Sequence, residues 1–264
     1  MKNRIVLMVL SVVMFCAAIG ITVYFFWANG YFKPTTESAP TTTYDSFTYP
    51  SFETTAISDM ITESAEETGE TEYVCPVDFA SLQAANPDII GWIYMEEPYI
   101  SLPILMNPTD DTVYLYHDAE GNYSKEGALF VEHKYNSGDF TDPCTIIYGH
   151  RMSDGSMFGS MQGICQEAGY FDEPRYIVIY TPTDTKIYQV FAITSTDNSH
   201  LMLKYDFDDP EDFNEFIDSV YSDNSIGFTH LEDIRPEAGD NILILSSCLW
   251  GDRLQRFLVL AVEV

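Results

Sequence analysis

Short runs of β-forming residues, separated by Gly and Pro, dominate residues 73–264. Several of them alternate apolar and polar side chains, which is typical of half-buried strands. The runs cover residues 100–105, 128–132, 145–148, 176–180, 186–194, 241–246 and 257–264. Seven or eight short strands in about 190 residues predict a closed β-barrel or a β-sandwich.

Three segments have helical patterns: residues 77–86, 157–168 and 209–221. The last is the clearest, because Asp209 is a suitable N-cap and Pro210 suits the first helical position. Its apolar residues at positions 213, 216, 217 and 220 fall on one face of a helix. The sequence therefore predicts a mainly β domain with few helices.

A separate apolar segment precedes this domain. Residues 5–27 carry no charge, and about 20 apolar residues span a bilayer as a helix. Lys2 and Arg4 lie before the segment, which predicts a cytoplasmic N-terminus. The alternative is a cleaved signal peptide, but this run is longer than the usual apolar region of about 7–15 residues. We predict that residues 1–33 are a cytoplasmic tip and a retained transmembrane anchor in the cell membrane.

Residues 34–72 differ from both neighbours in composition. They are rich in Thr, Ser, Pro and Glu, and they contain nine acidic residues. Such a segment buries too little apolar surface to offset the entropy lost on ordering. We predict a disordered stalk that holds an extracellular domain, residues 73–264, away from the membrane.

The charge of the chain excludes some partners. The formal net charge is −29, and residues 73–264 alone carry nine basic and 32 acidic residues. Phosphate recognition needs a basic face, so nucleic acid is excluded as a partner. Broad adhesion to an anionic lipid surface is disfavoured for the same reason.

Five cysteines are present, of which Cys16 lies in the apolar segment. The other four, Cys75, Cys144, Cys165 and Cys248, could be free or form two disulfides. No pair has C-x-x-C spacing and no His-Glu-x-x-His occurs. The sequence therefore predicts neither a metal site nor a cofactor.

Three residues with catalytic potential lie at the ends of predicted strands. His150 follows the strand 145–148, Cys248 follows the strand 241–246, and Arg256 precedes the last strand. A Cys–His pair can form a covalent acyl-enzyme, and Arg can stabilise an oxyanion. Each residue also has a structural explanation, since a cysteine after an apolar strand is often simply buried.

The same three positions resemble the sortases, specifically class B. The family's Thr-Leu-x-Thr-Cys strand end corresponds to the sequence ILSSC at residues 244–248, in which both threonines are replaced. The family's Arg opens the last strand, as Arg256 does here, and its His follows a pair such as Tyr148-Gly149. Arg253 is a competing candidate that no apolar run follows.

Further class B features cover residues 77–264. Residues 86–93 are similar to the family's helix-to-strand entry, and residues 127–130 resemble the strand before its His. Residues 157–159 after the His are typical too, and residues 209–221 match the inserted helix between strands six and seven. The resemblance implies a sortase-type closed β-barrel of seven to eight strands, with an N-terminal helix and an inserted helix, preceded by a transmembrane helix.

The resemblance also implies the chemistry. Cys248 would attack the carbonyl after a Thr in the C-terminal sorting signal of a secreted protein. Arg256 would stabilise the oxyanion, and His150 would protonate the leaving amine and deprotonate the incoming one. The acceptor would be a peptidoglycan precursor or cross-bridge amine, or a pilin lysine, in a Gram-positive cell wall. Substrate contacts would come from Leu245, Ser246 and Ser247.

Two alternatives remain at this stage. One is another cell-wall cysteine enzyme, although papain-like enzymes place Cys before His and L,D-transpeptidases have a different motif around the Cys. The other is a non-enzymatic wall-binding module on a stalk, for which Cys248 would be inert and fully buried.

Overall fold

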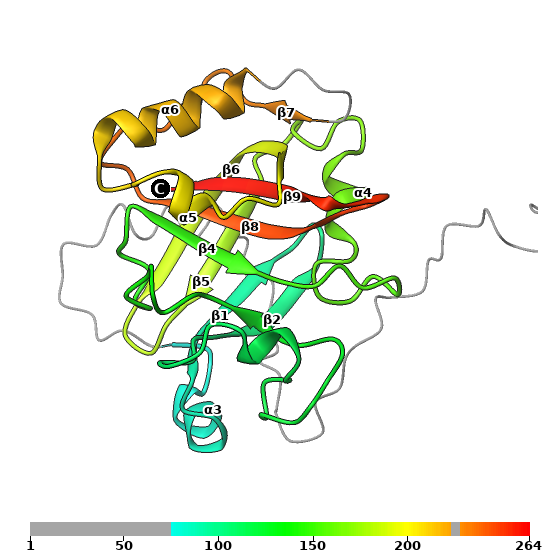
Figure 1. Ribbon diagram of the computed structural model, residues 1–264, viewed down its shortest axis with the longest axis vertical. Helices are drawn as coiled ribbons and strands as arrows, with labels where there is room; N and C mark the ends of the chain where they lie inside the picture. The colour runs from blue at the N-terminus through cyan, green and yellow to red at the C-terminus, as the bar shows by residue number, and fades with distance from the viewer. Residues whose placement is uncertain (1–74, 223–227) are drawn as a thin grey trace, which may run out of the picture. The chain divides into compact units, whose positions relative to one another are not determined.

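The structure is a computed structural model that describes residues 75–222 and 228–264. The elements, in chain order, are α3 (Phe79–Ala85), β1 (Ile89–Met95), β2 (Ile100–Leu105), η1 (Val113–Leu115), β3 (Leu129–Phe130), β4 (Cys144–Tyr148), α4 (Met161–Cys165), β5 (Tyr176–Tyr180), β6 (Thr185–Asp197), α5 (Leu201–Lys204), α6 (Pro210–Tyr221), β7 (Thr229–His230), β8 (Ile242–Leu249) and β9 (Asp252–Glu263). Figure 1 shows these elements.

The strands form one sheet that closes on itself. The strand order is β5-β1-β2-β3-β4-β8-β9-β6-β7, and β5 also pairs with β6. Eight strands therefore close a barrel, and the two-residue β7 is added beside β6. This arrangement confirms the predicted barrel of seven to eight strands, and it excludes the sandwich.

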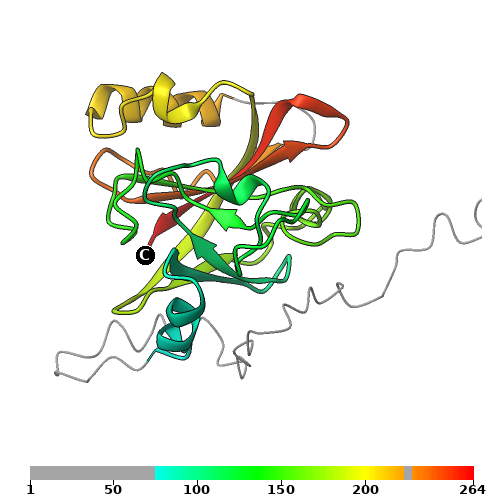
Figure 2. The same ribbon diagram turned by 60° about the horizontal axis from the view of Figure 1, so that its bottom comes forward.

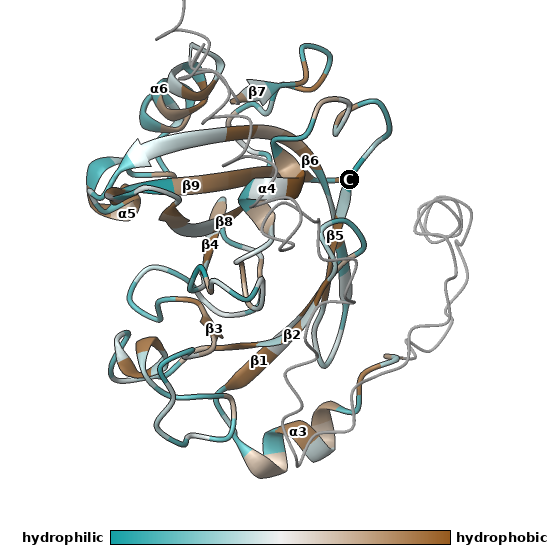
Figure 3. Ribbon diagram, turned by 90° about the vertical axis from the view of Figure 1, so that its right-hand side faces the viewer, coloured by the Kyte–Doolittle hydropathy of each residue, from teal (hydrophilic) through white to brown (hydrophobic). Residues whose placement is uncertain are grey.

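Both faces of the barrel wall are buried where helices cover it. Leu243 and Leu245 of β8 belong to the cluster inside the barrel. Ile242 and Ile244 alternate with them and pack in a second cluster, together with Phe213 and other residues of α6. Side chains alternate across a strand, so a strand buried on both faces is apolar throughout, as residues 242–245 are. Figure 3 shows this hydrophobic wall beneath the helical layer.

Helix α6 begins where the sequence predicts. Asp209 is the N-cap, and its carboxylate accepts hydrogen bonds from the backbone N–H groups of Glu211, at 2.8 Å, and Asp212, at 3.4 Å. The helix lies between β6 and β7 in the chain. The predicted inserted helix is therefore confirmed, and it packs on the outer face of the barrel.

Other predicted elements differ in extent. The predicted helix 157–168 is shortened to α4, because Met157 has a positive φ of 53° that no α-helix contains. The predicted strand 128–132 is reduced to β3, and the predicted helix 77–86 becomes α3. The residues of β1 were predicted only as part of a helix-to-strand segment, residues 86–93, and α5 and β7 were not predicted.

The last two strands form a longer hairpin than predicted. β8 continues through Cys248 to Leu249, and β9 begins at Asp252, before Arg256 rather than after it. A turn at Trp250 and Gly251 joins them, and Gly251 supplies a positive φ of 88° there. Figure 2 shows the tip of this hairpin projecting from the barrel.

The predicted transmembrane anchor, residues 1–33, and the predicted stalk, residues 34–72, lie outside the described residues. Within residues 75–222 and 228–264, no helix has the length and hydropathy needed to cross a bilayer.

Candidate active site

A groove with a volume of about 310 Å³ lies on the outer face of the barrel. Its floor comes from β4, β8 and β9. It includes Ile146 and Leu258, which belong to the second cluster, on the outer face of the barrel beneath α6. One wall is the end of β6 with the turn into α5, and the other contains η1 and the segment before it. The groove therefore has an apolar floor between two walls.

The pairing of β4 with β8 brings His150 and Cys248 to this groove. The two strands are parallel, and Tyr148 is the registered partner of Ser246. The register continues one step further, because the backbone N–H of Gly149 donates to the Ser246 carbonyl at 3.1 Å. His150 and Cys248 each follow that last registered pair by two residues, and both line the groove. Neighbouring strands lie about 4.8 Å apart, so this register makes the two residues neighbours.

The β8–β9 hairpin adds Arg256 to the same place. Arg256 is the direct cross-strand partner of Cys248. Its Nη1 atom lies 3.9 Å from Sγ of Cys248, within hydrogen-bond range for sulfur, and Arg256 also lines the groove. The structure thus brings all three predicted catalytic residues together. Arg253, the competing arginine, lies in β9, and its side chain is outside the described part of the structure.

Two hydrogen bonds hold His150. Its backbone carbonyl accepts from the N–H of Phe158 at 3.1 Å. Its Nε2 lies 2.9 Å from the carbonyl oxygen of Leu115. A carbonyl only accepts, so Nε2 carries a hydrogen, and Nδ1 of the neutral ring is left as the proton-accepting atom.

Gly149 allows this placement of His150. A Cβ at position 149 would lie 2.5 Å from Cδ2 of Leu129 and 2.5 Å from Cδ2 of Phe158. Both neighbours are buried core residues and cannot move freely. Only a glycine therefore fits between the end of β4 and the buried ring of Phe158.

We predict that Gly149→Ala moves His150 and lowers kcat/KM by about 100-fold, because a shift of about 1 Å at a catalytic group has such an effect. The overpacking should also lower the free energy of unfolding by about 1–3 kcal/mol. Kinetics together with urea unfolding measure both effects. Gly163→Ala is the control, since no atom lies within 4 Å of a Cβ there. Unchanged activity in Gly149→Ala would contradict this role.

The predicted substrate contacts divide into two groups. Ser246 lies on the groove face of β8, in alternation with Leu245, which is fully buried inside the barrel. Leu245 is therefore a core residue, and the expected substrate contact through its side chain is not supported. Ser247 borders the groove, but strand alternation directs its side chain to the same face as Leu245.

The four cysteines of the described residues are all free thiols. Cys144 and Cys165 are buried, and burial raises the pKa of the Cys144 thiol well above its usual value and that of Cys165 to about 12. Cys75 and Cys248 are half-buried. The alternative of an inert, fully buried Cys248 therefore does not hold, and no disulfide links these four residues.

We predict that iodoacetamide at neutral pH modifies Cys248 and Cys75 well before Cys144 and Cys165, because the thiolate is the reactive form. Peptide mapping by mass spectrometry at successive times measures the order. Loss of enzymatic activity should follow the modification of Cys248 and not that of Cys75. Modification of Cys144 before Cys248 would contradict the assignment.

Within residues 75–222 and 228–264, no three His, Cys, Asp or Glu side chains are arranged to hold a metal ion.

Curated proteins and solved structures resemble this chain over most of the described domain. Sortase B of Listeria monocytogenes is 26% identical over 171 residues, which are 65% of this chain and 67% of that protein. Sortase B of Staphylococcus aureus is 26% identical over 192 residues, 72% of this chain and 75% of that protein. A crystal structure of sortase B from Bacillus anthracis matches with a TM-score of 0.60 and 28% identity, over 75% of this chain and 87% of that one. No protein-family model matches the sequence.

These sortase B homologues support a class B sortase. They support an enzyme whose general activity is that of a sortase transpeptidase. The roles of His150, Cys248 and Arg256 in this sortase stay a prediction, which the variants below test.

The sortase groove also contains residues that the sequence analysis did not select. Asp111, Glu132 and His200 line the groove and lie far along the chain from the three predicted residues, and Tyr148, two residues before His150, lines it too. Burial raises the pKa of Tyr148, and the charge of Glu132 and a hydrogen bond to it act in the same direction. Tyr148 therefore stays protonated at neutral pH. No local motif marks these residues, because they come from four separate elements.

Proposed function

We propose that this sortase is anchored in the cell membrane by residues 5–27, with its N-terminus in the cytoplasm and its catalytic domain outside the cell. There it would cleave a C-terminal sorting signal after Thr and transfer the secreted protein to a cell-wall amine. That acceptor is a peptidoglycan precursor or cross-bridge amine, or a pilin lysine. The observation that carries the catalytic part of this proposal is the meeting of His150, Cys248 and Arg256 in one groove.

Acylation comes first. Nδ1 of His150 takes the thiol proton of Cys248 as the sulfur attacks the scissile carbonyl, and the carbonyl oxygen becomes an oxyanion beside the Arg256 guanidinium. His150 then gives a proton to the departing amine, so that the C–N bond breaks and a thioester remains on Cys248. The neighbouring positions of the three residues support this sequence of steps.

Transfer to the acceptor follows. The incoming primary amine attacks the thioester carbonyl, and His150 takes up a proton from the attacking nitrogen. Collapse of the tetrahedral intermediate forms the new amide bond and releases the sulfur of Cys248, which takes the proton back from His150. The Nε2 hydrogen bond to Leu115 supports this role, because it leaves Nδ1 as the atom that exchanges protons.

The test is direct observation of the acyl-enzyme. The full-length chain is incubated with peptides of Asn-Pro-x-Thr and Leu-Pro-x-Thr type, with and without an added amine, and is examined by mass spectrometry. An adduct on Cys248 that the amine removes, with a new amide product, is the expected result. An unreactive Cys248 that forms no adduct with any of these peptides would contradict the proposal.

A further inference from the structure

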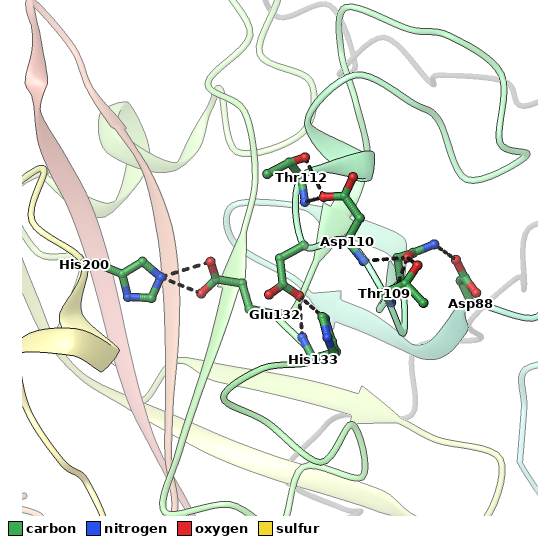
Figure 4. A network of polar contacts seen from close by, with 9 residues as sticks. Asp88, Thr109, Asp110, Thr112, Glu132, His133 and His200 are labelled. Carbon is green, nitrogen blue, oxygen red and sulfur yellow. Dashed lines mark hydrogen bonds and ion pairs between the residues drawn. The ribbon is translucent and has the colours of Figure 1, made fainter.

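Two consecutive residues of the chain contact opposite walls of the groove. Glu132 pairs with His200, whose Nε2 lies 3.0 Å from Oε1 and 2.9 Å from Oε2. His133 pairs with Asp111, with 2.6 Å between Nδ1 and Oδ1. Figure 4 shows Glu132 reaching toward His200 on one side, while His133 belongs to the network on the other.

The chain changes from extended to turn between the two residues. The segment after β3 continues in strand-like pairing as far as Val131, whose N–H donates to the carbonyl of Leu105 at 2.9 Å. Residues 133–135 then form a turn. Glu132 and His133 reach different walls, although they are adjacent in sequence.

The two partners belong to the walls themselves. His200 ends the turn between β6 and α5 and lines the groove. Asp111 lines the groove on the other side, shortly before η1. The carboxylate of Asp111 also accepts a hydrogen bond from the backbone N–H of His133 at 2.7 Å. Asp111 is therefore bonded to both the backbone and the side chain of His133.

The segment between the walls is fixed to the barrel. The carbonyl of Glu132 accepts hydrogen bonds from the N–H groups of Tyr135, at 3.2 Å, and Asn136, at 3.1 Å. The amide of Asn136 is buried and donates to the carbonyl of Cys144 in β4 at 2.7 Å. These hydrogen bonds fix the backbone of Glu132 and His133 relative to the barrel.

The carboxylates of both pairs are largely shielded from water, whereas the side chains of His200 and His133 are 29% and 32% exposed. The side chains of Glu132 and Asp111 are 16% and 18% exposed. The ring of His200 packs against Tyr135, with ring centroids 4.9 Å apart. Its Nδ1 is buried and has no hydrogen-bond partner among the described residues, which places the hydrogen on Nε2, where it is donated to Oε1 of Glu132. Hydrogen bonds to a carboxylate in such surroundings are stronger than neutral ones.

We propose that Glu132 and His133 form a crossbar that sets the distance between the two walls of the groove, and that they are positioning residues that determine how tightly the peptide substrate binds. The inference rests on the proposed function, since it assigns the peptide to this groove. The crossbar does not touch Cys248 or Arg256 in any described contact, so it acts on binding and not on the chemical steps.

Kinetics of the full-length chain with a peptide identified by the acyl-enzyme experiment test the proposal. Glu132→Ala and His200→Ala should each raise KM by about tenfold and leave kcat within about twofold. Glu132→Gln should stay close to the wild type, because its amide oxygen still accepts from Nε2–H of His200. The double variant Glu132→Ala/His200→Ala should be no worse than the poorer single variant, since both remove the same contact.

Three kinetic results would overturn the crossbar. One is a fall in kcat with an unchanged KM. Another is an unchanged KM in both single variants. The third is a full additional loss when Glu132→Ala is made in the His200→Ala chain, because Glu132 would then act through a group other than His200, such as Tyr148 or the substrate. His230→Ala is the control, since it breaks a histidine–carboxylate pair between β7 and the exposed Glu232, outside the groove, and should leave KM unchanged.

A substrate-free measurement separates this proposal from the proposed function. Amide hydrogen exchange of residues 197–201 should be faster in Glu132→Ala than in the wild type and in His230→Ala. Unchanged exchange would overturn the crossbar. If the wild type forms no acyl adduct, the proposed function fails, but the exchange result still decides whether the crossbar holds the wall.

Discussion

Replacing Cys248 with alanine is expected to lower transpeptidation by at least about 10⁴-fold and to leave the fold intact. The substitution removes the only atom proposed to form the covalent intermediate, and the remaining groups cannot supply a nucleophile. Cys248 is half-buried at the end of a hairpin, so the loss of its sulfur should change the free energy of unfolding by about 1 kcal/mol or less. Peptide turnover measured with product detection by mass spectrometry tests the first effect, and thermal unfolding tests the second.

Cys75→Ala is the matched control for this variant. Cys75 is also a half-buried free thiol, but it donates to the carbonyl of Thr181, and it does not line the groove. Its replacement should leave turnover within about twofold of the wild type, as for a substitution away from the site. Normal turnover in Cys248→Ala would disprove the catalytic assignment.

Replacing Arg256 with alanine is expected to lower kcat/KM by about 10²–10³-fold, the usual effect of removing one group that stabilises an oxyanion. Arg256 is the cross-strand partner of Cys248, and its Nη1 lies 3.9 Å from the sulfur. An oxyanion formed at a carbonyl bonded to that sulfur would therefore lie close to the guanidinium. The loss should appear in kcat, because the charge that Arg256 stabilises is present only in the transition state and the tetrahedral intermediate.

Two further variants refine the assignment of Arg256. Arg256→Lys keeps the positive charge but loses the planar donors, so it should recover only part of the activity. Arg253→Ala, in the same strand, should cost far less than Arg256→Ala. Equal losses at positions 253 and 256 would show that the wrong arginine was assigned.

Local patterns predicted much of the fold. The boundaries of β2 and β5 coincide with the predicted runs, and α6 begins at its predicted cap. These elements have strong local signals, such as an apolar run between turn residues or an Asp-Pro helix start. Elements with weak local signals were missed. β7 has two residues and α5 has four, and their conformations depend on what packs against them.

The structure corrected the predicted positions of Cys248 and Arg256 within their strands. Both residues were expected outside the strands, yet they form a registered pair inside the β8–β9 hairpin. Residues 246–256 are mostly polar, so a pattern of hydrophobicity does not reveal the end of β8 or the start of β9. The pairing of β8 with β9 extends beyond the hydrophobic core to Leu249 and Asp252, and the turn at Gly251 closes the hairpin.

By itself, the sequence determined where most strands of the barrel lie, where its inserted helix begins, and which His, Cys and Arg lie at strand ends. These properties follow from periodicity, capping and the chemistry of single side chains, all of which are local. Only the tertiary structure decided that β4 runs parallel to β8 with Tyr148 opposite Ser246, and that Glu132 and His133 reach opposite walls of the groove. Such contacts join residues far apart in the chain, and their geometry depends on strand register and barrel closure, which no local pattern specifies.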